Sequence, residues 1–339
     1  MTPIYLSEQD VRRALSAGEI YAVVEETLRA TAEGRVVNGA KTGFTLDDAA
    51  GARFLGGAPA GLPDAGVAGI KWFATCAGNG ELGLPRVPAT MIVCDSTTGM
   101  LRGIVDATAL TAWRTAALAL AAIKPCASAT LAKAAVIGLG AIGKALVHYL
   151  PSELGVRRIA VFGRDHAKTQ RDGASLAAAL SISVDAATSA EQAVRDADLV
   201  ITATGLDRDA PFVHGDWIKP GATVCGLGSY QELDETVITR ARRIFVDHRE
   251  GCAQRGNIAP LIKAGRLGQD RIDGEVAELV AGRLVGRASA HETVVIALIG
   301  IGSLDIALAA RALERAAAGG LGQRLMTSHA FDVLNEQHL

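Results

Sequence analysis

A glycine-rich turn between a short apolar run and a helical pattern constrains this chain more than any other segment. The run Ala134–Ile137 is typical of a buried strand, and Gly138-Leu139-Gly140-Ala141-Ile142-Gly143 follows it directly. In such a G-x-G-x-x-G turn the first glycine allows a tight bend, the second lets a pyrophosphate approach the backbone, and the third lets the helix pack on the strand. Free N–H groups at the start of the helix would bind the pyrophosphate.

A second strand favours a dinucleotide site over the alternative, a simple tight turn in an Ala/Gly-rich helix. This strand, Arg158–Phe162, ends at Gly163, twenty residues after Gly143, where an acidic residue usually binds the ribose 2'-hydroxyl. Arg164 instead offers a guanidinium to a 2'-phosphate, so the sequence favours NADP over NAD as cofactor. Asp165 keeps NAD open, since a shift of two residues would bring its carboxylate to the ribose.

The composition excludes several classes of protein. With 339 residues, 49% hydrophobic and 21% charged, the chain is expected to form two domains of an ordinary soluble protein. A formal charge of -2 and the lack of a basic run give no reason to expect nucleic acid. The N-terminus has no signal-peptide pattern, and the apolar runs are too short to cross a membrane. Five scattered cysteines without a C-x-x-C motif indicate reduced thiols, a cytoplasmic location and no metal site.

The first part of the chain combines helices and a sheet. Two capping boxes, Ser7-Glu8-Gln9-Asp10 and Ser16-Ala17-Gly18-Glu19, predict two helices, the second running to about Gly34. Short β-rich runs separated by Gly and Pro over Val36–Val105 predict an antiparallel sheet. The Ala- and Leu-rich segment Ala107–Lys124 is expected to be a helix.

The second half alternates strands and helices, as a doubly wound parallel sheet requires. A long final helix is expected over Thr293–Ala318. The predicted fold class is therefore α/β, a Rossmann-type doubly wound parallel sheet plus a second α+β domain. The expected bounds are 1–125 for a substrate-binding and dimerisation domain, 126–304 for the dinucleotide-binding domain, and 305–339 for a C-terminal helix returning to the first domain. Strands are predicted at Ala134–Ile137, Arg158–Phe162, Ser183–Asp185, Leu199–Ala203, Thr223–Gly226 and Ile244–Val246.

Two cations outside the nucleotide unit are candidates for chemistry. Arg114 lies in the Ala- and Leu-rich helix, where an unpaired guanidinium is costly to bury, so it should meet a carboxylate or a phosphate. The alternative is a structural ion pair with Asp95 or Asp106. Lys71 lies at the end of a predicted strand, where a lysine is usually only solvated. Asp305 on the final helix is expected to pack against other helices or to pair with a lysine.

Together with further motifs, these residues resemble the ornithine cyclodeaminase/mu-crystallin family. The resemblance runs from about residue 1 to Ala310 and includes Gly300 and Asp305 near its end. Members include cyclodeaminases, alanine dehydrogenases, cyclic ketimine reductases and amino-acid dehydrogenases that make siderophore precursors, so the resemblance identifies a family and not a substrate. The matching motifs are Lys71, Gly83-Leu84-Pro85-Arg86-Val87, Thr98-Gly99, Leu110-Thr111-x-x-Arg114-Thr115-Ala116-Ala117, Gly138–Gly143 and Gly228-Ser229-x-x-Glu232-Leu233.

The resemblance implies roles for the matching positions. Lys71 matches a lysine that holds the amino-acid carboxylate or polarises the reacting C=N or C=O bond, and Arg114 and Thr115 match an Arg-Thr pair near cofactor and substrate. Cations placed there would stabilise the negative charge that develops on nitrogen or oxygen. Further cofactor contacts are implied for Thr202, Thr204, Gly226, Leu227, Gly228 and Ser229. For Thr202 and Thr204 the alternative is an ordinary loop between a strand and a helix.

The chain departs from the family pattern at three positions. Many members have an arginine on the early strand where this sequence has Asn38-Gly39-Ala40-Lys41, so Lys41 or Arg53 must bind the substrate carboxylate. Ser229 stands where cyclodeaminases have an aspartate that assists ring closure. Arg86 replaces a threonine common at a cofactor-contacting position. The missing aspartate favours net reduction or oxidation over cyclodeamination.

The expected function is that of an NAD(P)-dependent oxidoreductase acting on the C–N bond of a small amino acid. It would reduce an imine or ketimine, or reductively aminate a 2-oxo acid. One alternative is an NAD-dependent ornithine or lysine cyclodeaminase that releases ammonia, and another is a non-catalytic NADP-binding protein of mu-crystallin type. The resemblance also implies a homodimer, because the family covers an apolar sheet face by pairing subunits.

Overall fold

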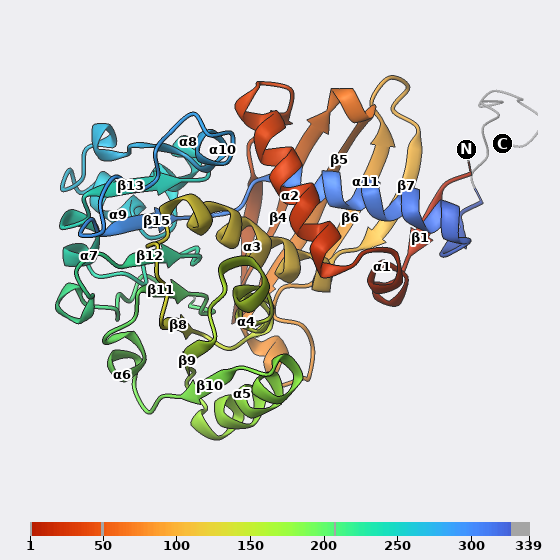
Figure 1. Ribbon diagram of the computed structural model, residues 1–339. Helices are drawn as coiled ribbons and strands as arrows, with labels where there is room; N and C mark the ends of the chain where they lie inside the picture. Colours follow the sequence, from red (N-terminus) through yellow and green to blue (C-terminus); the bar gives the residue numbers. More distant parts are fainter. Residues whose placement is uncertain (1, 49–50, 207, 327–339) are drawn as a thin grey trace, which may run out of the picture.

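Two eight-stranded sheets occupy the two halves of the protein (Figure 1). The computed structural model describes residues 2–48, 51–206 and 208–326. Within these residues the first sheet has the order β16-β1-β7-β6-β5-β4-β2, with β3 paired to β4. Its strands are β1 Ile4–Leu6, β2 Val37–Asn38, β3 Thr42–Asp48, β4 Gly51–Leu62, β5 Val67–Cys76, β6 Ala89–Asp95, β7 Leu101–Asp106 and β16 Gln323–Arg324.

The antiparallel sheet predicted for the first half is confirmed for β3 to β7. Strand β1, which the sequence analysis did not predict, pairs parallel to β7, so the complete sheet is mixed. Alternation along β5 and β6 sends Lys71 and Met91 to a buried face, whereas Trp72 and Ile92 point to the opposite, exposed face. One face of this sheet is therefore covered by the rest of the protein, and the other is exposed.

Helices cover the buried face of the first sheet. Helix α11 (Gly302–Gly319) packs against β4, β5 and β6 and lies along this sheet in Figure 1, in blue. Helices α1 (Glu8–Ala14) and α2 (Ala17–Ala32) begin at the two predicted capping boxes. Helix α3 (Thr108–Ile123) confirms the Ala- and Leu-rich helix, and it packs on α2 and on α4 (Ala141–Leu154).

The second sheet is parallel throughout, as a Rossmann-type fold requires, with the order β10-β9-β8-β11-β12-β15-β13-β14. All six predicted strands are present. The strands are β8 Ala134–Ile137, β9 Arg158–Phe162, β10 Ser183–Ala186, β11 Leu199–Thr202, β12 Thr223–Gly226, β13 Arg243–Val246, β14 Gly274–Glu275 and β15 Val294–Ala297. The helices are α4 Ala141–Leu154, α5 His166–Leu180, α6 Ala190–Val194, α7 Glu235–Thr239, α8 Arg249–Gln254, α9 Ala259–Lys263 and α10 Val276–Val280.

The prediction of one long helix over Thr293–Ala318 is wrong at its beginning. Val294–Ala297 forms β15, which lies between β12 and β13, and the helix begins only at Gly302. A central parallel strand is apolar on both faces, so its periodicity does not distinguish it from a buried helical turn. Gly300, with φ of +76°, turns the chain between the two elements.

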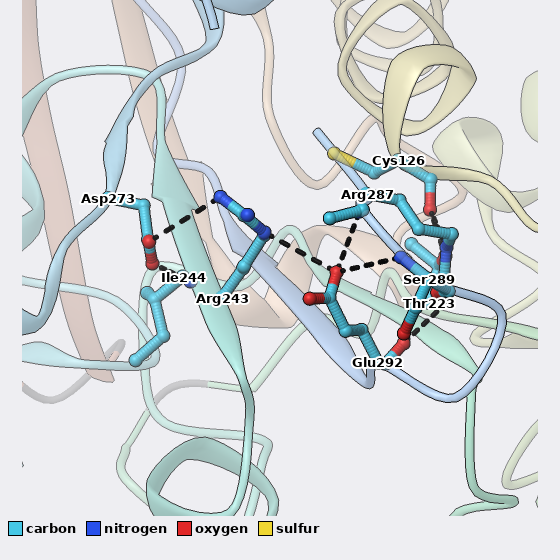
Figure 2. A network of polar contacts seen from close by, with 9 residues as sticks. Cys126, Thr223, Arg243, Ile244, Asp273, Arg287, Ser289 and Glu292 are labelled. Atoms are coloured by element: carbon cyan, nitrogen blue, oxygen red, sulfur yellow. Dashed lines mark hydrogen bonds and ion pairs between the residues drawn. The ribbon is translucent and has the colours of Figure 1, made fainter. Parts of the chain in front are cut away.

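A polar network holds the end of α3 to the amino edge of the second sheet (Figure 2). The Arg287 guanidinium donates to the Cys126 carbonyl at 2.9 Å and to the Thr223 hydroxyl at 3.0 Å. Glu292 accepts from Arg243 at 3.4 Å and from the amide of Ala288 at 2.8 Å. Because ligands of parallel α/β sheets bind at the opposite, carboxyl edge, we assign this network to stability.

The two sheets fall within the chain segments expected for the two domains, with α11 and β16 returning to the first sheet. The domain bounds at 125, 126, 304 and 305 stay a prediction. Residues 327–339 of the expected C-terminal segment lie outside the described residues.

Candidate functional site

The glycine turn after β8 has the geometry of a dinucleotide-binding loop. Gly138 has φ of +100°, and a Cβ there would lie 2.5 Å from the carbonyl oxygen of Ala203, the residue that follows the neighbouring strand β11. A Cβ at Gly143 would lie 2.0 Å from the Gly138 carbonyl oxygen. Around Gly140, by contrast, there is open space, and this exposed residue is the N-cap of α4. The first turn of α4, including Ala141 and Ile142, thus leaves its N–H groups available to a pyrophosphate.

The end of β9 lies on the same carboxyl edge of the sheet. A Cβ at Gly163 would lie 2.5 Å from the Thr169 hydroxyl, so α5 approaches the strand closely here. Arg164 is exposed. Asp165 is the N-cap of α5, and its Oδ1 accepts from the Lys168 amide at 2.9 Å. One carboxylate oxygen of Asp165 is therefore already used by the helix.

Glu232, to which the sequence analysis gave no role, joins the turns after β11 and β12. Its buried carboxylate accepts from the Thr202 hydroxyl at 2.6 Å, from the Thr204 amide at 3.1 Å and from the Thr204 hydroxyl. Burial raises its pKa, although these hydrogen bonds act in the opposite direction. The signal available in the sequence was the family motif Gly228-Ser229-x-x-Glu232-Leu233, which contains this glutamate three residues after a predicted cofactor-binding turn.

The turn after β12 is held close to its neighbours. Leu227 donates its amide to the Thr202 carbonyl at 3.0 Å, and a Cβ at Gly226 would lie 2.4 Å from Asn257 Nδ2. A Cβ at Gly228 would meet the Glu232 carboxyl at 2.6 Å. Ser229 is exposed beyond this turn.

Arg86 brings the first half of the chain to the same edge. Its Nε lies 2.8 Å from where a Cβ of Gly205 would stand, just after β11 and Thr204.

On α3, Thr115 uses its hydroxyl to donate to the Thr111 carbonyl at 2.7 Å.

A buried ion triad lies between the first sheet and α11. Asp305 binds Lys71 Nζ through Oδ2 at 2.7 Å and Arg114 Nε through Oδ1 at 2.7 Å. Lys71, Arg114 and Asp305 are only 3%, 5% and 0% exposed. The expected lysine partner of Asp305 is confirmed. Lys71 lies in the middle of β5 and is buried, so the alternative interpretation, a merely solvated lysine at a strand end, is wrong.

The partners proposed for Arg114 as a structural ion pair are also wrong. Asp95 binds Arg102 at 2.6 Å, and Asp106 accepts from the Thr108 amide at 3.1 Å. Arg114 instead pairs with Asp305, which is 191 residues away along the chain. Only the tertiary fold brings these two residues together.

The charges of the triad shift its pKa values. Burial and the neighbouring Arg114 lower the pKa of Lys71 to about 8, although Asp305 acts in the opposite direction. Burial disfavours the ionised form of Asp305, but Arg114 and Lys71 outweigh it and hold its pKa below the usual value. The triad therefore combines an ionised carboxylate with a lysine that can lose its proton near neutral pH.

The loop between β15 and α11 links this triad to the carboxyl edge of the second sheet. A Cβ at Gly300 would lie 2.6 Å from Arg114 Nη1. Lys41 Nζ donates to the carbonyl oxygens of Ile299, at 2.7 Å, and of Gly300. Asp247 accepts from the Gly300 amide at 2.6 Å.

Lys41 and Arg53, the two alternatives for carboxylate binding, have different locations. Lys41 lies beside the triad, and burial, with Arg255, Arg114 and Lys71, lowers its pKa well below the usual value. Arg53 pairs in register with Cys76 on β5, which places its side chain on the face opposite to Lys71, and it forms an ion pair with Asp48. The structure therefore places Lys41 beside the triad and Arg53 away from it. Lys41 and the triad are called the cationic cluster below.

Two further charged residues of this cluster, Asp247 and Arg255, were missed. Arg255 Nη2 lies 3.4 Å from the Ile299 carbonyl oxygen. No motif marked either residue, because they follow β13 in a region where the sequence pattern is weak.

Metal and membrane features are absent from the described ranges. Among residues 2–48, 51–206 and 208–326, no three His, Cys, Asp or Glu side chains gather in a way that could bind a metal ion. Over the same residues, every helix is too short or too polar to span a membrane.

Comparisons with known proteins agree with this geometry. The family model of the ornithine cyclodeaminase/mu-crystallin family matches residues 1–320. An alanine dehydrogenase from Archaeoglobus fulgidus is 29% identical over 336 residues, which covers 96% of this chain and 98% of the relative. A delta(1)-pyrroline-2-carboxylate reductase from Paracoccus denitrificans is 29% identical over 249 residues, covering 71% and 77% of the two chains.

Two solved structures share the whole fold. The delta(1)-pyrroline-2-carboxylate reductase of Thermococcus litoralis, in complex with NADH and L-proline, superposes with a TM-score of 0.89 at 26% identity and covers 95% of this chain and 100% of that one. An archaeal alanine dehydrogenase dimer with bound NAD gives a TM-score of 0.88 at 27% identity, with 96% and 99% covered.

Proposed function

Because the chain belongs to the ornithine cyclodeaminase/mu-crystallin family, we propose that it is an NAD(P)-dependent oxidoreductase acting on the C–N bond of a small amino acid. It reduces an imine or ketimine, or reductively aminates a 2-oxo acid. One observation carries this proposal. The Lys71–Asp305–Arg114 triad lies next to the carboxyl edge of the dinucleotide-type sheet, because Arg114 approaches Gly300 in the loop after β15. The alanine dehydrogenase and pyrroline-carboxylate reductase relatives perform reactions of this class.

The two parts of the site are separated by a distance that suits a dinucleotide. The glycine turn follows β8 and the Gly300 loop follows β15, with β11 and β12 between them. Three strand spacings of about 4.8 Å put these two loops roughly 14 Å apart. A dinucleotide with its pyrophosphate at Gly140 would reach across Thr204 and Leu227 towards the cationic cluster.

Each part of the cluster has a chemical task in this proposal. The bound dinucleotide supplies or accepts the hydride. Lys71 donates a hydrogen bond to the reacting nitrogen or oxygen, where negative charge develops. Lys41 and Arg114 bind the carboxylate of the substrate and thereby orient its α-carbon. Asp305 keeps Lys71 and Arg114 in place.

Cyclodeamination and non-catalytic binding remain the competing functions. Ser229 cannot act as the acid or base that an aspartate at this turn would provide. Burying a triad that includes a lysine whose pKa is lowered to about 8 costs folding free energy, and a protein that only binds a nucleotide gains nothing from it. Both features favour the oxidoreductase.

The experiment that tests this function follows NADPH and NADH oxidation at 340 nm with purified protein. Pyruvate with ammonia tests reductive amination, cyclic imino acids test imine reduction, and ornithine or lysine tests ammonia release. Turnover of an oxo or imino acid with stoichiometric cofactor oxidation supports the proposal. Ammonia release from ornithine without net cofactor oxidation would show a cyclodeaminase instead.

We propose that the cofactor preference is for NADPH, with Arg164 as its cause. This side chain is exposed at the tip of β9, and one carboxylate oxygen of Asp165 is already bound to the α5 backbone. Arg164→Ala should raise KM for NADPH about tenfold and change KM for NADH by less than twofold, since only the 2'-phosphate contact is lost. Steady-state kinetics with both cofactors measures this, and equal effects on both would contradict a 2'-phosphate contact.

The pH profile should report the proton on Lys71. Its pKa is lowered to about 8, so the protonated fraction falls as the pH rises through this value. If Lys71 donates a hydrogen bond to the substrate, kcat/KM should drop about tenfold per pH unit above pH 8. Lys71→Arg stays protonated, so the residual activity of this variant should show no such drop. A wild-type profile that is flat up to about pH 10 would exclude Lys71 as this donor.

We propose that the protein is a homodimer formed through the outer face of the first sheet. This face exposes Phe44, Leu46, Trp72 and Ile92, and the rings of Phe44 and Trp72 lie 6.4 Å apart. Exposed apolar patches of this kind mark interfaces. Trp72→Glu should shift the mass from dimer to monomer in light scattering, whereas Leu82→Glu, at an exposed residue of the loop before β6, should not. A monomeric wild-type protein would disprove the proposal.

A cytoplasmic location is part of the same proposal. It is supported by the five cysteines, all of which have free thiols.

A further inference from the structure

The cluster of charged residues at the junction of the two sheets, part of it buried and part half-buried, holds more cations than carboxylates. Both ion pairs within it go to a single carboxylate, that of Asp305. Four basic side chains face two carboxylates, so basic groups outnumber acidic groups by two. The cations are Lys41, Lys71, Arg114 and Arg255, and the carboxylates are Asp247 and Asp305.

Arg255 is the cation of this cluster with the weakest compensation. Among residues 2–48, 51–206 and 208–326, its only hydrogen-bond partner is the Ile299 carbonyl, at 3.4 Å, and no carboxylate of these ranges lies within 4.0 Å of it. Burial lowers its pKa, although Asp247 acts in the opposite direction. A guanidinium does not lose its proton in proteins, so this charge is not removed by titration as that of a lysine can be. An anionic ligand would therefore gain most from binding here.

Asp247 does not neutralise Arg255 because its oxygens are used by the backbone. Oδ2 accepts from the Ile299 amide at 3.1 Å and from the Gly300 amide at 2.6 Å, and Oδ1 accepts from the Cys252 thiol at 3.3 Å. These bonds hold the loop that presents its carbonyls to Lys41 and Arg255. The loop thus places a second cation close to the proposed substrate site.

We propose that Arg255 is a specificity-determining residue that binds a second, distal carboxylate, so that the substrate is a short dicarboxylic imino or 2-oxo acid. This inference rests on the proposed function, in which Lys41, Lys71 and Arg114 bind the first carboxylate and the reacting atom. A dicarboxylate brings one carboxylate to Lys41 and Arg114 and a second carboxylate to Arg255. A monocarboxylate of equal length leaves Arg255 desolvated beside a methyl group, which is unfavourable.

The test compares substrates matched in length. Oxaloacetate is paired with 2-oxobutyrate, and 2-oxoglutarate with 2-oxopentanoate, each with ammonia and NADPH or NADH. The wild type is expected to favour the dicarboxylate of at least one pair by about 100-fold in kcat/KM. Arg255→Gln should reduce this ratio by about 100-fold, mainly through KM of the dicarboxylate, and Arg255→Lys should restore part of it.

A matched control removes an exposed arginine of the same domain. Arg266 pairs with Glu235 on the surface, so Arg266→Gln should keep the wild-type ratio. A wild type that favours the monocarboxylates would overturn the inference. So would an equal loss of both activities in Arg255→Gln, because this would mean that Arg255 only supports the Ile299 loop.

Equilibrium binding separates this inference from the proposed function. If neither these oxo acids nor the cyclic imino acids of the activity test are turned over, the proposed function is wrong, and calorimetric titration with succinate and butyrate in the presence of NADPH still tests Arg255. Tighter binding of succinate that is lost in Arg255→Gln supports the inference. Equal binding of the two acids to the wild type overturns it.

Discussion

Replacing Lys71 by methionine is expected to lower kcat by about 10³, with a smaller change in KM. Lys71 Nζ pairs with Asp305 at 2.7 Å, and the residue is only 3% exposed. In the variant no water can therefore take over the hydrogen bond that Lys71 donates to the substrate. Methionine fills a similar volume without the charge. Steady-state and single-turnover kinetics with the same oxo or imino acid measure the loss.

Cofactor binding supplies the control for the Lys71 variant. The glycine turn is about three strands away from Gly300, so the affinity for NADPH, measured by fluorescence titration, should stay within about twofold of the wild type. A variant that keeps most of its kcat would contradict the proposed role of Lys71. Loss of NADPH binding as well would indicate that Lys71 supports the structure of the site instead.

Asp305→Asn is expected to destabilise the protein by about 3–5 kcal/mol. Asp305 is fully buried and is the ion-pair partner of both Lys71 and Arg114. The asparagine leaves two buried cations without an anion, and Lys71 must then lose its proton or Arg114 must be exposed to water. Equilibrium unfolding in urea, followed by circular dichroism, measures the change.

A double variant distinguishes charge from packing at Asp305. Combining Asp305→Asn with Lys71→Met removes one of the two unpaired cations, so the double variant should be more stable than Asp305→Asn alone. Asp185→Asn is the control, because Asp185 makes only exposed contacts, an ion pair with Arg158 at 4.0 Å and a hydrogen bond from the Ser183 hydroxyl at 3.3 Å, so its loss should leave the midpoint unchanged. Additive losses in the double variant would show that Asp305 contributes through packing and not through its charge.

Local patterns in the sequence were sufficient where neighbouring residues determine the structure. The G-x-G-x-x-G turn predicted β8, the start of α4 and the parallel sheet, because tight turns and helix starts depend on residues a few positions apart. The capping boxes at Ser7 and Ser16 predicted α1 and α2 for the same reason. Strand β15 was missed, because an apolar run of four residues carries no period that separates strand from helix.

The sequence by itself determined the two-part architecture, the family and the cations Lys71, Arg114 and Lys41 as candidates. Only the tertiary structure decided that Asp305, not Asp95 or Asp106, pairs with Arg114, that Arg53 points to the other face of the sheet, and that Arg255 joins the cluster. The physical reason is separation along the chain. These contacts join residues that are dozens to hundreds of positions apart, and their charges are set by burial, which no local pattern encodes.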